Sequence, residues 1–113
     1  MYSTLTQKHG FIDENIYVLC SDGTDPSIDR EEIDASGTHY VNSNPDLDND
    51  GLDDIDYAAT RSNIQNIFTN TLKNNLTTED FLYVFVSDHG IYSPNGFVAW
   101  GNELIEDQEL ASW

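Results

Sequence analysis

Apolar residues in this chain are concentrated in two short runs that have the character of β-strands. The first run, residues 16–20, reads Ile-Tyr-Val-Leu-Cys, and the second, residues 81–86, reads Phe-Leu-Tyr-Val-Phe-Val. Both runs are apolar on both faces and rich in β-branched or aromatic residues, a pattern typical of central strands in a parallel sheet. The sequence therefore predicts two buried strands.

Residues 60–75, between the two runs, repeat apolar side chains with the period of a helix. The apolar positions of this face are Ile64, Ile67, Phe68 and Leu72. Thr60 precedes them as an expected N-cap, and Asn74 and Asn75 mark the expected end. A strand, a helix and a second strand in this order form a crossover that makes the two strands parallel. The carboxyl ends of both strands would then meet at the ligand-binding edge of the sheet.

Shorter elements are expected on either side. Residues 1–9 indicate a helix that ends at Gly10, and a turn at residues 93–96 precedes a short strand at 97–100. Another helix is expected to begin near Glu106. Residues 24–57 show no sustained period, so they are predicted to form one long loop.

Composition and charge narrow the classes of partner. The 113 residues carry 4 Lys and Arg against 21 Asp and Glu, and a net charge of −17 opposes binding to nucleic acid or to anionic membranes. Such acidity favours cations and extracellular or periplasmic surroundings. Cys20 is the only cysteine, which excludes an internal disulfide and a cysteine zinc cluster.

The most acidic stretch, residues 46–57, has the spacing of a calcium loop. Aspartates stand at loop positions 1, 3, 5 and 9, a glycine at position 6, and an apolar residue that offers its carbonyl at position 7. The expected Ca²⁺ ligands are Asp46, Asp48, Asp50, the carbonyl of Leu52, and Asp54. Position 12 is Tyr57 in place of the bidentate Glu, so Asp53 or Asp56 would have to replace that acid. The alternative is a solvated acidic turn without a cation.

His89 directly follows the second apolar run, where its ring would lie at the edge of the sheet. A histidine in this place can exchange protons near neutral pH, and Gly90 beside it allows a substrate carbonyl to approach the backbone amide. The alternative is a histidine that only ends the strand and bonds locally.

These residues carry a resemblance to a known family. The stretch Phe81-Leu-Tyr-Val-Phe-Val-Ser-Asp-His-Gly90, the hairpin after it, Phe97-Val-Ala-Trp-Gly and Leu104-Ile-Glu-Asp resemble the legumain-like branch of the caspase-fold (clan CD) cysteine peptidases. The resemblance implies an α/β fold, a three-layer caspase-like sandwich with a mostly parallel sheet. Residues 1–113 would form a partial peptidase domain with the acidic calcium-type loop inserted at about 42–57.

The resemblance also implies roles for two residues. His89 would be the catalytic histidine of a cysteine endopeptidase, and the amide of Gly90 would help to bind the oxyanion. Caspase-type nucleophilic cysteines lie about 50 residues after their histidine, and Trp113 is the last residue here. Cys20 ends an earlier strand and is expected in the core, so it does not replace them.

We therefore expect an internal fragment of a peptidase domain, inactive alone, whose partners are a protein or peptide substrate and the remainder of its own domain. Two other interpretations stay open. One is a calcium-binding extracellular module in which His89 is structural, and the other is an inactive pseudo-peptidase used for binding.

Overall fold

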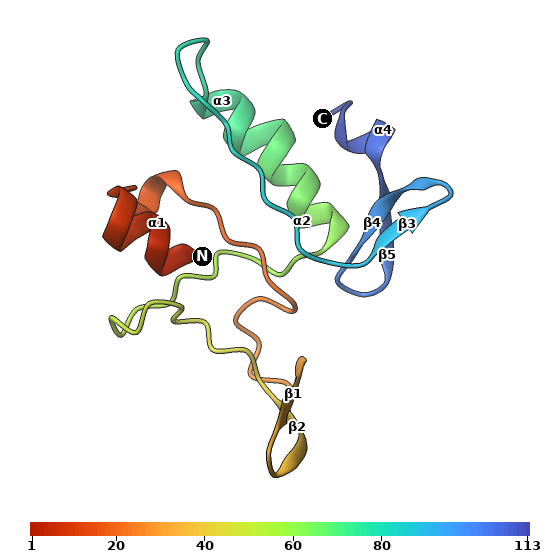
Figure 1. Ribbon diagram of the computed structural model, residues 1–113. Helices are drawn as coiled ribbons and strands as arrows, with labels where there is room; N and C mark the ends of the chain where they lie inside the picture. The colour runs from red at the N-terminus through yellow and green to blue at the C-terminus, as the bar shows by residue number, and fades with distance from the viewer. The chain divides into compact units, whose positions relative to one another are not determined.

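The computed structural model describes residues 1–113, which divide into two compact units, Met1–Ala59 and Thr60–Trp113. Figure 1 colours the first unit from red to yellow-green and the second from green to blue. Each unit has its own secondary structure and is described by itself.

The first unit begins with helix α1, Tyr2–His9, which ends at Gly10. Gly10 has a left-handed backbone (φ 69°), and its amide donates to the carbonyl of Thr6 at 3.2 Å. This is the C-terminal cap that glycine forms readily because it has no Cβ, and it confirms the predicted helix end. A single 3₁₀ turn, Asp13–Asn15, follows.

A β-hairpin lies inside the stretch that was predicted to be one long loop. Strands β1, Arg30–Asp34, and β2, Gly37–Val41, pair antiparallel, with Asp34 opposite Gly37 at the turn. Almost every residue of the hairpin is exposed, so its strands lack the alternation of apolar and polar residues by which a half-buried strand is recognised. The available signal is the Ser-Gly dipeptide at the turn, where the Asp34 carboxylate accepts the Ser36 amide at 2.7 Å.

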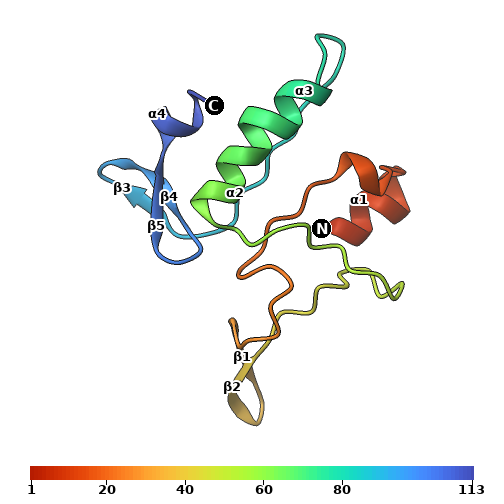
Figure 2. The ribbon, with the colours of Figure 1, turned by 180° about the vertical axis from the view of Figure 1, so that it is seen from behind.

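The second unit opens with the expected helix, built from α2 (Arg61–Asn66), a π-helical stretch (Ile67–Leu72) and α3 (Lys73–Asn75). Figures 1 and 2 show one continuous green rod. The hydroxyl oxygen of Thr60 accepts the amide of Asn63 at 3.3 Å, which confirms the predicted N-cap. The helix also ends at Asn75, as its sequence indicates.

The rest of the second unit is a small antiparallel sheet followed by helix α4, Asp107–Leu110. Its strands are β3 (Gly90–Tyr92), β4 (Asn95–Ala99) and β5 (Glu103–Glu106), in that spatial order. Residues 93–94 connect β3 to β4, which confirms the predicted turn. The buried side chains of this unit are Ile67, Leu72, Ala99 and Ile105, and Ile105 is fully buried.

The predicted fold class is wrong. The structure contains a two-stranded and a three-stranded sheet, both antiparallel, in place of a mostly parallel three-layer sandwich. Residues 16–20 make one isolated parallel bridge, Leu19 to Tyr57, and residues 81–86 lie outside any strand. An apolar run indicates that a segment can be buried, but strand formation also needs a partner backbone, and no local pattern specifies that partner.

None of the helices combines the length and the apolar character that crossing a bilayer requires.

Candidate functional site

The acidic loop of the first unit is organised by the carboxylate of Asp46. Its Oδ1 atom accepts the amides of Asn49 at 2.6 Å and Asp50 at 3.2 Å, and its Oδ2 atom accepts the amide of Gly51 at 2.9 Å. Gly51 has φ 94°, a left-handed conformation that only glycine adopts without strain. The first acid of the loop therefore determines the path of the next five residues.

Asp54 closes the loop from its other end. Its Oδ2 atom accepts the amides of Leu47 at 2.6 Å and Asp48 at 3.2 Å, and its own amide donates to the carbonyl of Pro45 at 2.9 Å. Residues 45–54 thus form a ring of local hydrogen bonds that needs no hydrophobic core to define it.

Within this ring three carboxylates converge. Asp46, Asp48 and Asp50 each offer one oxygen, and the three oxygens all lie within 4.8 Å of one another. Two oxygens on opposite sides of one calcium ion, each about 2.4 Å from it, are also about 4.8 Å apart. The three aspartates form an exposed acidic cluster that could bind a single metal ion.

Asp48 is the most perturbed member of the cluster. Its Oδ1 atom is buried and has no hydrogen-bond partner. Burial raises the pKa of its carboxyl group, and the negative charges of Asp50, Asp54 and Asp46 raise it further. A buried carboxylate oxygen that faces other acids and no donor is an unfavourable arrangement, which a cation would relieve.

The remaining predicted ligands are less favourably placed. Leu52 directly follows Gly51, and its amide donates to the Asp50 carboxylate at 2.8 Å. Asp56, one of the two acids considered for position 12, instead accepts the amide of Val18 at 2.8 Å. Tyr57 at position 12 is bridged to Leu19. The end of the loop is therefore tied to residues 16–20, and the structure gives the twelfth position no carboxylate.

Tyr2 is a neighbour of the loop that the sequence did not reveal. Its side chain is buried, with 8% of the residue exposed. Burial raises the pKa of its hydroxyl group, and the nearby carboxylates of Asp13 and Asp54 raise it further. Tyr2 of α1 therefore lies near the residue that closes the loop. Nothing in the local spacing around Tyr2 could have indicated this proximity, because the two residues lie at opposite ends of the unit's sequence.

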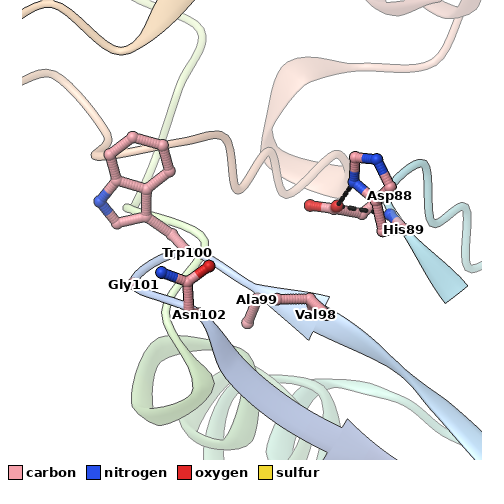
Figure 3. Close-up of a pocket in the computed structure, with 7 residues that line it drawn as sticks. All are labelled: Asp88, His89, Val98, Ala99, Trp100, Gly101 and Asn102. Carbon is pink, nitrogen blue, oxygen red and sulfur yellow. Dashed lines mark hydrogen bonds and ion pairs between the residues drawn. The ribbon is translucent and has the colours of Figure 1, made fainter. Parts of the chain in front are cut away.

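His89 lies in the second unit, next to Asp88, and its side chain is 97% exposed. The Nδ1 atom of His89 is 3.3 Å from Oδ1 of Asp88. Figure 3 marks this interaction with a dashed line. Because a carboxylate only accepts hydrogen bonds, Asp88 favours the His89 tautomer that carries its proton on Nδ1. In that tautomer the Nε2 atom can accept a proton or a hydrogen bond. Both residues line a shallow hollow of about 430 Å³ with residues 98–102 of β4 and the turn after it.

Gly90 begins β3 and pairs with Phe97. A Cβ atom at Gly90 would meet nothing closer than the Gly96 carbonyl oxygen at 3.9 Å, so packing does not require glycine there. Cys20 belongs to the first unit, and its half-buried Sγ atom contacts the hydroxyl of Ser21 at 3.8 Å. Within its own unit, His89 therefore has a carboxylate partner and no thiol.

Comparison with protein-family models, with curated proteins and with solved structures finds no match to this chain. The functional assignment therefore depends on the residues themselves.

Proposed function

We propose that this protein binds calcium through the loop of residues 46–54. The observation that supports the proposal is the convergence of three carboxylate oxygens from Asp46, Asp48 and Asp50 inside a loop that its own hydrogen bonds hold in place. The carbonyl of Leu52 and the carboxylate of Asp54 would complete the protein ligands, and water would fill the other positions.

Calcium suits this loop better than magnesium does. Ca²⁺ accepts six to eight oxygen ligands in a flexible geometry, whereas Mg²⁺ requires a near-ideal octahedron and gives up its water reluctantly. Position 12 carries Tyr57, so the site lacks the bidentate acid that tightens complete loops. We expect a dissociation constant on the order of 10⁻⁴ to 10⁻³ M, the range of extracellular calcium modules.

Isothermal titration of the 113-residue chain with CaCl₂, and separately with MgCl₂, tests the proposal. Asp48→Asn removes one converging charge and should abolish most of the calcium heat. Glu31→Gln is the matched control, because Glu31 is an exposed acid of strand β1, outside the loop. Absence of calcium uptake at millimolar concentrations, or equal losses in both variants, would contradict the proposal.

A second proposal concerns His89 and rests on the resemblance to legumain-like cysteine peptidases. We propose that His89 takes the proton of a cysteine thiol, that the thiolate attacks the substrate carbonyl, and that His89 then returns the proton to the leaving amine. The hydrogen bond from His89 to Asp88 and the hollow that both residues line support this role. The amide of Gly90 would stabilise the oxyanion.

The test uses the peptidase in its active form, which needs a cysteine other than Cys20. His89→Ala should lower turnover by about 10² to 10⁴, while His39→Ala, at an exposed histidine of the β1–β2 hairpin, should leave it unchanged. Unchanged turnover in His89→Ala would assign His89 a structural role only.

A further inference from the structure

The second apolar run, residues 81–86, is exposed along its whole length. The exposed fraction runs from 42% at Leu82 to 87% at Phe81. Within the unit Thr60–Trp113, no backbone hydrogen bond joins residues 81–88 to other residues. Six consecutive apolar residues with free backbone groups form a surface that a folded protein ordinarily covers.

The side chains of residues 81–86 are typical of a strand that is buried on both faces. In an extended chain alternate side chains point to opposite sides. One side would then carry Phe81, Tyr83 and Phe85, and the other Leu82, Val84 and Val86. The run leads into β3, which occupies the outer position of the β3-β4-β5 sheet and so has an open edge. An added strand could therefore pair with residues 81–86 and continue along β3.

Acidic residues bracket the run and limit what can pair with it. Asp80 lies directly before it and Asp88 two residues after it. In an antiparallel pair of two copies centred between Tyr83 and Val84, Glu79 would face Asp88. In a parallel pair in register, Asp80 would face its own copy. Like charges directly opposite each other are destabilising, and each copy carries a net charge of −17. A second copy is therefore a poor partner.

We propose that residues 80–88 bind an extended polypeptide segment that is apolar in its centre and carries a basic residue at each end. Asp80 and Asp88 are eight positions apart, about 27 Å in a strand, so the two basic residues of the partner should also be eight positions apart. Backbone hydrogen bonds would supply affinity, and the charge pairs would supply register and selectivity. This surface is distinct from the acidic loop of residues 46–54, and it borders His89, whose ring bonds to Asp88.

Two capped nine-residue peptides test the proposal by calorimetric titration of the 113-residue chain at low salt. The Lys peptide is Lys-Thr-Val-Thr-Val-Thr-Val-Thr-Lys, and the Glu peptide has Glu at both ends. The Lys peptide should bind more tightly, by up to about fivefold for each charge pair. The preference should shrink as salt is added, because salt screens exposed charges.

Variants of the chain make the test specific. Val84→Pro removes a backbone donor and should abolish binding, whereas Val84→Thr keeps a β-branched side chain and should preserve it. Neither change breaks a backbone hydrogen bond of the folded chain. Asp88→Lys should remove most of the preference for the Lys peptide, because each peptide then makes one attractive and one repulsive charge pair with residues 80 and 88.

Three results would overturn the proposal. Equal affinity for both peptides would indicate unspecific apolar adhesion. Dimers in sedimentation equilibrium that Val84→Pro dissociates, without peptide binding, would identify a second copy as the occupant. A monomer that binds neither peptide would show that the run accepts no added strand.

Discussion

The Asp54 carboxylate accepts the backbone amide of Asp48 at 3.2 Å, while the Oδ1 atom of Asp48 lies buried with no hydrogen-bond partner. The Asp54 carboxylate therefore fixes the backbone of Asp48, but no hydrogen-bond donor reaches the buried Oδ1 atom of Asp48. The arrangement defines the geometry of the loop at an electrostatic cost that a bound cation would reduce.

Replacing Asp48 by Asn should separate the electrostatic cost of the loop from its response to calcium. Without calcium, Asp48→Asn should melt at a higher temperature than the unmodified chain, because it removes repulsion from Asp46, Asp50 and Asp54. With calcium it should show little further rise. Differential scanning calorimetry with and without 10 mM CaCl₂, about ten or more times the expected dissociation constant, measures both. A variant less stable than the unmodified chain in the absence of calcium would contradict the electrostatic argument.

The calcium effect should also depend on pH. The folded state raises the pKa of Asp48, so this group adds stability below its unfolded pKa and loses that contribution as pH rises through the folded pKa. Calcium needs the deprotonated carboxylate. The calcium-dependent rise in melting temperature should therefore be full near neutral pH and disappear as pH falls through the raised pKa of Asp48.

Melting curves at a series of pH values, with and without calcium, check this dependence. The calcium contribution to the free energy of unfolding follows mass action. It should be about 2.7 kcal/mol when the free calcium concentration is one hundred times the dissociation constant. A calcium effect that persists in strong acid would show that the cation binds elsewhere.

Two glycines of the small sheet should respond differently to alanine. A Cβ atom at Gly96 would lie 2.2 Å from the carbonyl oxygen of Ile105 in β5, so Gly96→Ala must displace backbone at a fully buried residue. We expect it to cost about 3 kcal/mol or more of unfolding free energy. Gly90→Ala has room and should change stability by less than about 1 kcal/mol. Urea denaturation of both variants gives the comparison, and equal losses would refute it.

The 113-residue chain should hydrolyse no peptide by itself. Its single thiol, on Cys20, contacts the Ser21 hydroxyl and has no histidine partner. A thiol without an adjacent base to take its proton is a weak nucleophile near neutral pH. A broad set of fluorogenic peptides should therefore give no turnover above buffer. Turnover that Cys20→Ala abolishes would show that Cys20 is the nucleophile.

Local signals in the sequence were sufficient for the end of α1, the long helix of the second unit and the turn before β4. The N-cap at Thr60, the glycine stop at Gly10 and the turn before β4 are each decided by residues a few positions apart, so their spacing is enough to predict them. The acidic loop belongs to the same class, because its hydrogen bonds join residues at most nine positions apart. The convergence of Asp46, Asp48 and Asp50 could therefore be predicted from their spacing.

Strand pairing could not be predicted in this way. The apolar runs at residues 16–20 and 81–86 were expected to pair in one parallel sheet, yet the structure forms its sheets from the polar segment 30–41 and from residues 90–106. A strand gains its hydrogen bonds only from another backbone, and the choice of that backbone depends on distant contacts that no local pattern encodes. The same reason explains why the proximity of Tyr2 to Asp54 is decided only by the folded chain, whereas the alternating acids of the loop are already evident in the sequence.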